Sequence, residues 1–188
     1  MKRPLTVLAA SVIAFALSGC DIGEEPLSRS ESADISAKEE YLCEKVVGCR
    51  EKPRGESVEF EMPEFHGVKF KLDEDGLNVL EIADGMEKGL YWGMPVIDVY
   101  LSDLNGDGKR EICSTVAMGS GIVDERIYAY DLVHERLYTL QDRFFCNYRL
   151  ELKDGALFYV QTPDTLDGEV LSAPLTLDKM TQTDKSQI

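Results

Sequence analysis

Apolar and polar side chains begin to alternate at Val58, and the alternation returns repeatedly through the rest of the chain. A period of two residues is typical of strands that bury one face. Segments rich in Gly, Asp and Ser separate these runs and favour turns. The predicted strands include residues 68–72, 77–82, 97–101, 112–118, 123–132, 136–140, 146–152, 157–161 and 169–177.

Two local patterns sharpen this prediction. Residues 112–118 are mostly small or β-branched and lack the alternation, as expected of a strand buried on both faces. Lys153-Asp154-Gly155 separates two alternating runs and predicts a hairpin. We therefore expect a mainly β domain of about ten short strands over residues 58–178, with antiparallel sheets arranged as a sandwich or as a propeller-blade-like meander.

The segments on either side of this domain differ from it. Residues 36–57 begin with Ser36–Glu39, which fits a capping box, and Gly48 fits a helix stop. The sequence thus predicts one short N-terminal helix from Ala37 to Val47, followed by a linker. At the other end, residues 179–188 are polar and are predicted to be a flexible tail.

Acidic residues outnumber basic ones over the whole chain. Its 188 residues include 20 Lys and Arg and 35 Asp and Glu, which gives a formal net charge of −15. The first 19 residues contain two basic and no acidic side chains, so without them 18 basic residues would oppose 35 acidic ones, a net charge of −17. Such a chain repels nucleic acid, which is excluded as an expected partner, and favours cations.

The first 19 residues have the organisation of a secretory signal. Lys2-Arg3 precedes Leu5–Leu17, an apolar run of 13 residues that is short for a transmembrane helix and typical of a signal-peptide core. Leu17-Ser18-Gly19-Cys20 then resembles the bacterial lipobox, in which cleavage falls before the cysteine and the cysteine becomes acylated. The resemblance implies a signal peptide at residues 1–19, a lipidated Cys20 and a membrane anchor in the bacterial cell envelope.

The residues after the lipobox refine the expected location. Residues 20–35 are rich in Ser, Glu and Gly and predict a disordered tether between membrane and domain. Asp21 resembles the signal that keeps enterobacterial lipoproteins in the inner membrane, so in a Gram-negative cell it implies inner-membrane retention facing outside the cytoplasm. The alternative is plain secretion, with Cys20 as an ordinary residue.

Four cysteines follow Cys20, and an even number outside the cytoplasm predicts disulfide bridges. The disulfide candidates are Cys43, Cys49, Cys113 and Cys146. Three pairings are possible. A bridge between Cys43 and Cys49 would fasten the end of the predicted helix to the next loop, and pairing of these cysteines with those of the β domain is the alternative. Cys113 and Cys146 both lie in predicted strands, and a bridge between them is favoured over the alternative of two free buried thiols.

The clearest chemical signal is the acidic loop, which we define as residues 103–111 with the sequence Asp-Leu-Asn-Gly-Asp-Gly-Lys-Arg-Glu. Ca²⁺ binds about six to eight oxygens, and Gly108 permits the sharp turn that would bring them together. The predicted metal ligands are Asp103, Asn105 and Asp107 through their side chains, Lys109 through its carbonyl, and Glu111 directly or through water. The loop is not an EF-hand, because Ser114 stands where a bidentate Glu would be required. The alternative is a metal-free turn whose carboxylates accept backbone N–H groups.

The remaining polar motifs predict no catalysis. His134-Glu135 begins like the zinc-protease motif, but the fifth residue is Tyr138 and the context is a polar turn. Gly119-Ser120-Gly121 does not form a nucleophile elbow. The chain contains two histidines, so a zinc site is not expected. No catalytic residue is predicted.

The acidic loop and the residue after it, 103–112, resemble the calcium loop of FG-GAP and VCBS repeats. Those repeats form β-propeller blades and bind Ca²⁺ through residues that match Asp103, Asn105, Asp107 and Glu111. This chain has one such loop, whereas a full propeller needs about four or more blades.

A longer part of the chain, about residues 60–175, resembles an uncharacterised extracytoplasmic domain. That domain occurs in bacterial lipoproteins and is appended to antirepressor-type membrane metallopeptidases. The segments that carry the resemblance are Met62–Phe65 with Gly67-Val68, Gly93–Pro95, residues 103–112, Gly119–Ile122 and Tyr130-Asp131. The peptidase motif is absent here, so the resemblance implies a sensor or binding module.

The leading hypothesis is a membrane-anchored, non-catalytic binding or sensing module with a structural Ca²⁺ loop. Its expected partners are the membrane, through the lipid anchor, and an envelope protein or a small ligand. One rival is an envelope hydrolase that uses acidic residues, which predicts a deep pocket with at least two carboxyl groups of raised pKa. Another is a purely structural envelope protein with a metal-free turn.

Overall fold

The computed structural model describes residues 43–46, 48, 51, 53–142, 145–165 and 167–184. These residues form thirteen strands and one short 3₁₀ turn, η1 (Leu177–Lys179), and they contain no α-helix. All strand pairs are antiparallel and belong to three sheets. The predicted mainly β fold with antiparallel sheets is confirmed.

The largest sheet has six strands in the order β1-β6-β7-β8-β9-β13. They are β1 (Glu44–Val46), β6 (Val96–Ser102), β7 (Glu111–Met118), β8 (Asp124–Asp131), β9 (Arg136–Leu140) and β13 (Thr181–Thr183). Strands β6 to β9 are neighbours in sequence and in space, whereas β1 and β13 add to the two edges from opposite ends of the described chain.

The other two sheets are meanders. One contains β2 (Val58–Glu61), β3 (Lys69–Leu72), β4 (Asn78–Ala83) and β5 (Met86–Trp92), and the other contains β10 (Cys146–Lys153), β11 (Ala156–Pro163) and β12 (Leu171–Pro174). Asp154 and Gly155 have φ of 50° and 78° and connect the register partners Lys153 and Ala156. Positive φ at both central residues is the geometry of a two-residue hairpin turn, so the predicted hairpin is confirmed.

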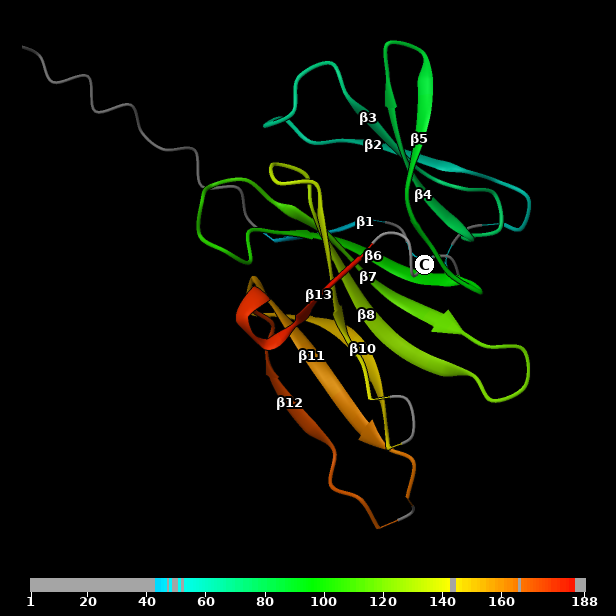
Figure 1. The fold of residues 1–188 in the computed structure, drawn as a ribbon, viewed down its shortest axis with the longest axis vertical. Helices are drawn as coiled ribbons and strands as arrows, with labels where there is room; N and C mark the ends of the chain where they lie inside the picture. Colours follow the sequence, from blue (N-terminus) through cyan, green and yellow to red (C-terminus); the bar gives the residue numbers. More distant parts are fainter. Residues whose placement is uncertain are drawn as a thin grey trace, which may run out of the picture. The chain divides into compact units, whose positions relative to one another are not determined.

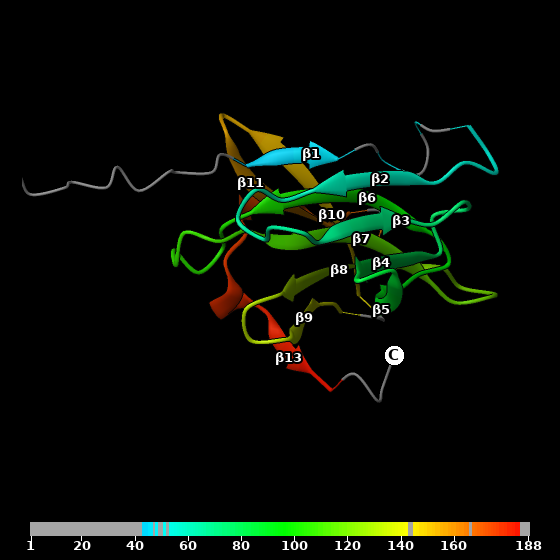
Figure 2. The same cartoon turned by 90° about the horizontal axis from the view of Figure 1, so that it is seen from above.

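The six-stranded sheet is the middle layer of three (Figure 1). The β2–β5 sheet covers one face around a first apolar cluster that includes Phe70 and Ile112. The β10–β12 sheet covers the other face around a second cluster that includes Cys113 and Leu150. Seen from above, β2, β3 and β4 lie in front of the middle sheet (Figure 2). Because both faces are covered, β7 is buried almost throughout, as its unbroken run of small and β-branched residues predicts.

The structure does not support the helix predicted from Ala37 to Val47. Its first residues lie outside the described part, and Glu44–Val46 form strand β1, which pairs with β6. Val46 is buried in the first apolar cluster, and Glu44 accepts a hydrogen bond from Arg110 at 3.2 Å. Pairing with β6 and this burial outweigh a local helical preference, which is a weak determinant by itself.

Two further strands are absent from the sequence-based prediction. The first half of β5 is exposed, so its residues lack the alternation that marks the other strands. Strand β13 falls inside the predicted tail and pairs with β9, where the hydroxyls of Thr139 and Thr183 lie 2.8 Å apart. Met180 is buried in the second cluster, so residues 179–184 are packed against the domain.

The bridge expected between Cys113 and Cys146 is not found, because both thiols are free. Cys113 lies in the middle sheet, whereas Cys146 begins β10 and its sulfur accepts a hydrogen bond from Gln161 at 2.9 Å. Both thiols belong to the second cluster, where unpaired cysteine packs as a small apolar side chain. Cys43 is also free, and Cys20 and Cys49 lie outside the described residues.

Residues 37–188 belong to one compact unit. Every described strand and both apolar clusters lie in this unit, so it contains the complete core that a domain needs to fold alone. The predicted signal peptide and tether lie outside the described residues. Within the described part, no helix has the length and apolar character needed to cross a membrane.

Candidate metal centre

The acidic loop connects β6 to β7 in the middle sheet. Ser102 and Glu111 are register partners, so the ladder between the two strands closes the loop at its base. Gly106 and Gly108 have φ of 76° and 85°, a left-handed conformation that a side chain would oppose. The two glycines therefore let the chain turn back sharply enough for its early side chains to meet its own backbone.

Hydrogen bonds fold the first half of the loop around Asp103. Its two carboxylate oxygens accept the N–H groups of Gly106 at 2.7 Å and Gly108 at 2.8 Å. The side-chain oxygen of Asn105 accepts the N–H of Asp107 at 2.8 Å. These short-range bonds are the kind that Asx side chains make in turns, and they fix the path of the loop.

The second half of the loop is held by Glu111. Its Oε2 accepts the N–H of Leu104 at 2.6 Å, and its Oε1 accepts Nδ2 of Asn105 at 2.9 Å. Oδ1 of Asp107 accepts the N–H of Lys109 at 2.7 Å. The side chains of Asn105, Asp107 and Glu111 are therefore linked by hydrogen bonds, whereas the Asp103 carboxylate accepts backbone N–H groups of the loop.

Glu111 is the buried member of this network, with an exposure of 2%. Burial raises the pKa of its carboxyl group to about 8, and the nearby charges of Asp131, Asp103 and Asp107 add to the rise, while the hydrogen bond from Leu104 opposes it. Desolvation and like charges both disfavour the carboxylate form. The carboxyl group of Glu111 therefore keeps its proton at neutral pH unless a cation stabilises the charged form.

The two basic residues of the loop point to other partners. Nζ of Lys109 lies 3.4 Å from the carbonyl oxygen of Glu64 and 4.8 Å from the ring centre of Phe65. Arg110 forms two hydrogen bonds to the Glu64 carboxylate, from Nε at 2.7 Å and from Nη2 at 3.0 Å. A third, from Nη1 at 3.2 Å, goes to Glu44. Both cations of the loop are therefore used to bind β1 and the connection between β2 and β3.

No Lys or Arg in the described part forms an ion pair with a carboxylate of the loop. The carboxylates concerned are those of Asp103, Asp107 and Glu111. A hard divalent cation would offset their repulsion, and an all-oxygen donor set suits Ca²⁺. As the side chains stand, however, no group of three or more His, Cys, Asp or Glu residues in the described part is arranged around a metal position. The oxygens accept loop N–H groups instead, so metal binding requires some of them to turn inward.

The oxygen donors of the loop are therefore the kind that Ca²⁺ prefers, although they are not arranged around a common position. Side-chain oxygens of Asp103, Asn105, Asp107 and Glu111 and the carbonyl of Lys109 would hold the ion. A bound ion would supply positive charge to the loop, whose own cations Lys109 and Arg110 bind Glu64 instead.

Two residues that interact with the loop are not predicted from the sequence. Asp131 ends β8 beside the register pair Ile112–Tyr130, which places it near Glu111 although it is distant in sequence. Glu64 lies 46 residues before Arg110. No local pattern marks either residue, because both act through strand register and sheet packing. The segment Met62–Phe65 is distinguished only by its part in the wider resemblance.

The His134 segment is the polar turn that the sequence predicts. The N–H of His134 donates to Oδ1 of Asp131 at 3.0 Å, and its Nδ1 lies 2.7 Å from Oδ2 of the same carboxylate. Asp131 is 3% exposed, and the contact fixes the turn between β8 and β9.

No family model matches this sequence, and neither a curated protein nor a solved structure matches the chain.

Proposed function

We propose that the chain is a lipid-anchored module of the bacterial envelope that binds Ca²⁺ in its acidic loop and serves in binding or sensing, without catalysis. Cys20 would carry the lipid, and residues 20–35 would tether the domain to the membrane. The ion would fix the loop between β6 and β7 and, through Arg110, the elements packed beside it.

The observation that carries the calcium assignment is the charge imbalance in the loop. The loop contains the carboxyl groups of Asp103, Asp107 and Glu111, the last at 2% exposure, while the side chains of Lys109 and Arg110 reach to Glu64. A buried carboxylate is costly unless a cation or several hydrogen bonds compensate it. A bound Ca²⁺ would provide that compensation.

The test is a calcium titration of residues 35–188, followed by thermal melting in calcium and in chelator. A ligand that binds the folded state stabilises it by RT ln(1 + [L]/Kd), so a saturating ion at about 100 times Kd adds about 2.7 kcal/mol. For a unit of this size that corresponds to a rise of about 5–11 °C in the melting temperature. Equal melting temperatures in the two buffers would favour the metal-free turn.

The hydrolase alternative finds less support in the arrangement of side chains. One cavity of about 370 Å³ is lined by residues between Glu61 and Lys69, and another of about 290 Å³ is lined by residues that include Glu125 and Arg149. Glu111 lines neither of them. A general acid needs direct access to its substrate, and Glu111, the carboxyl group of the described part whose pKa burial raises to about 8, is 2% exposed and therefore unsuited to that role.

A further inference from the structure

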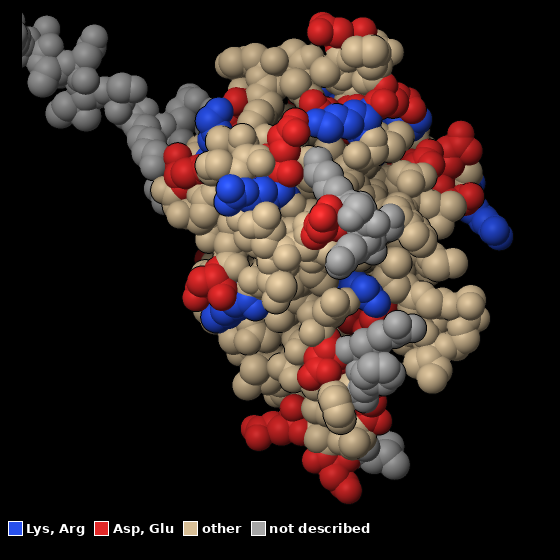
Figure 3. Space-filling view, viewed as in Figure 1, with Lys and Arg blue, Asp and Glu red and all other residues tan. Residues whose placement is uncertain are grey.

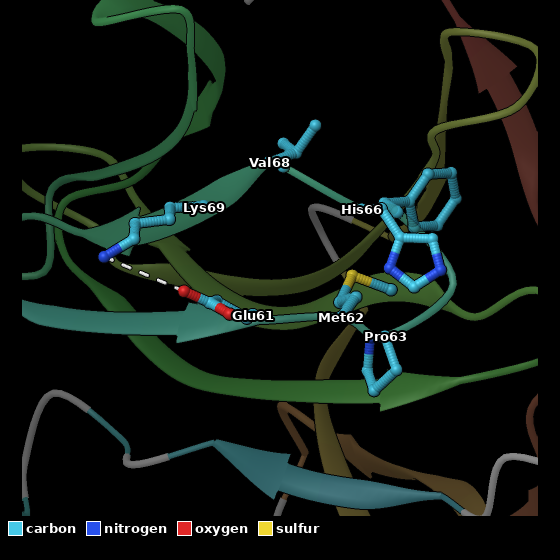
Figure 4. A pocket seen from close by; sticks show the side chains of 8 residues that line it. Glu61, Met62, Pro63, His66, Val68 and Lys69 are labelled. Atoms are coloured by element: carbon cyan, nitrogen blue, oxygen red, sulfur yellow. Dashed lines mark ion pairs between the residues drawn. The ribbon is translucent and has the colours of Figure 1, made fainter.

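An open cavity of about 370 Å³ lies at the connection between β2 and β3. Its walls combine apolar groups from Met62, Pro63, Phe65 and Val68 with the imidazole of His66. Figure 4 shows Met62, Pro63 and His66 grouped at one end, with the ion pair of Lys69 and Glu61 at the other. A volume in this range is typical of sites for small organic molecules.

The charged end of the cavity is negative on balance. Nζ of Lys69 lies 3.7 Å from a carboxylate oxygen of Glu61 and 3.8 Å from one of Glu59. The charged lining residues Lys69 and Glu61 offset each other, and Glu59, which lies outside the lining, adds one negative charge beside the cavity. Acidic side chains are scattered over the face of the molecule seen in Figure 3, several of them beside basic ones. An anionic ligand is therefore disfavoured, whereas a neutral or singly positive one is accepted.

The wall of the cavity is fastened to the acidic loop. Glu64, between the lining residues Pro63 and Phe65, is held by Arg110 through hydrogen bonds of 2.7 and 3.0 Å, and its carboxylate also accepts the backbone N–H of Arg110 at 3.2 Å. The side chains of Arg110 and Glu64 are 4% and 3% exposed. Lys109 lies against the Phe65 ring at 4.8 Å. Two consecutive loop residues thus determine where this wall sits.

We propose that the cavity bounded by Glu61–Lys69 is a binding site for a small, mainly apolar molecule without negative charge, and that Ca²⁺ in the acidic loop strengthens its binding. The coupling half of this inference rests on the proposed calcium function. Ordering of the loop fixes the backbone at Lys109 and Arg110, and through Glu64 and Phe65 it fixes the cavity wall. A wall that is already ordered costs less conformational entropy when the ligand binds.

The test uses two fluorescent probes with the same aromatic framework. N-phenyl-1-naphthylamine is neutral, and 8-anilino-1-naphthalenesulfonate adds one negative charge. Residues 35–188 are titrated with each probe in calcium and in chelator. We expect saturable binding of the neutral probe, at least about tenfold weaker binding of the anionic one, and about threefold or more tighter binding of the neutral probe in calcium, within the usual range of coupling between sites.

Three variants locate the effect. His66→Trp places a larger side chain in the cavity and is expected to weaken the neutral probe at least tenfold, whereas the matched control Ile122→Trp, on an 87% exposed residue outside the lining set, is expected to leave it unchanged. Glu64→Gln is expected to remove the calcium dependence of probe binding. Equal affinities in His66→Trp and the parent would overturn the cavity site.

Melting curves recorded on the same samples separate the two proposals. If calcium raises the melting temperature but leaves probe affinity unchanged, the coupling is refuted and the calcium function stands. If calcium changes neither quantity, the calcium function is refuted and the coupling with it, while His66→Trp still decides whether the cavity binds the probe.

Discussion

Removing one partner of the Arg110–Glu64 ion pair is expected to destabilise the domain strongly. The two side chains are 4% and 3% exposed, and two parallel N–H···O bonds of 2.7 and 3.0 Å join them. Arg110→Met leaves the Glu64 carboxylate buried with the backbone N–H of residue 110 as its remaining partner in this pair. Glu64→Leu removes both of these hydrogen bonds from the guanidinium and leaves its bond to the exposed Glu44 in place.

The magnitude follows from burial. Breaking a buried pair by removing one partner costs about 3–5 kcal/mol, because the other charge stays desolvated. At about 2–4 °C per kcal/mol for a domain of this size, the melting temperature should fall by about 6–20 °C. The double variant Glu64→Leu/Arg110→Met removes both charges, so we expect it to be more stable than either single variant.

The control is an ion pair of equal length at the surface. Nζ of Lys88 lies 2.7 Å from Glu135, but the two side chains are 45% and 63% exposed. Exposed pairs contribute about 0–1 kcal/mol, so Lys88→Met should change the melting temperature little. All variants are melted in chelator, which removes any contribution of calcium from the comparison.

The pH dependence gives an independent check. Burial acts to raise the pKa of Glu64, but hydrogen bonds from Arg110 outweigh it, and the pKa lies below the ordinary value of 4.5. The unfolded state then binds more protons than the native state as pH falls below that value, so stability from the pair is lost in this direction. The difference between the parent and the Glu64→Leu variant should shrink in acid. Equal decreases in melting temperature in Arg110→Met and Lys88→Met would show that burial of the pair does not matter. A decrease in the double variant equal to the sum of the decreases in the two single variants would show that the two side chains do not interact.

Three further outcomes follow from other sites. Asp107→Ala should lower the melting temperature in calcium and change it little in chelator, and equal shifts in both buffers would count against an ion at the loop. In chelator, the free energy of unfolding should fall by up to about 1.4 kcal/mol per pH unit between pH 4.5 and 8. Folded Glu111, with a pKa of about 8, keeps a proton in this range that the unfolded chain releases. Denaturant unfolding of Glu111→Gln should show no such slope. Tyr91→Phe should lower the free energy of unfolding in urea by about 1–3 kcal/mol, because it leaves the buried Ser114 hydroxyl without the 2.5 Å contact to the Tyr91 oxygen. Tyr138→Phe, in which the altered side chain is only half-buried, should lower it less.

Local patterns in the sequence are sufficient for the strands and turns whose character depends on near neighbours. The alternation at residues 69–72 gives β3, the apolar run at 112–118 gives the doubly covered β7, and Asp154-Gly155 gives a hairpin. The course of the acidic loop is also local, because its oxygens accept N–H groups only two to seven residues away. In each case the determining partners are close in the chain, so their spacing already contains the geometry.

The tertiary structure decides the features that depend on distant partners. Glu44–Val46 become a strand because β6 offers them an edge, and Cys113 and Cys146, which lie in strands of different sheets, are both free. Arg110 binds residues that lie 46 and 66 positions away, and these contacts leave the carboxylates of the acidic loop without its own cations. Strand register and packing of the whole core determine which residues meet across sheets. A short segment of sequence does not contain that information.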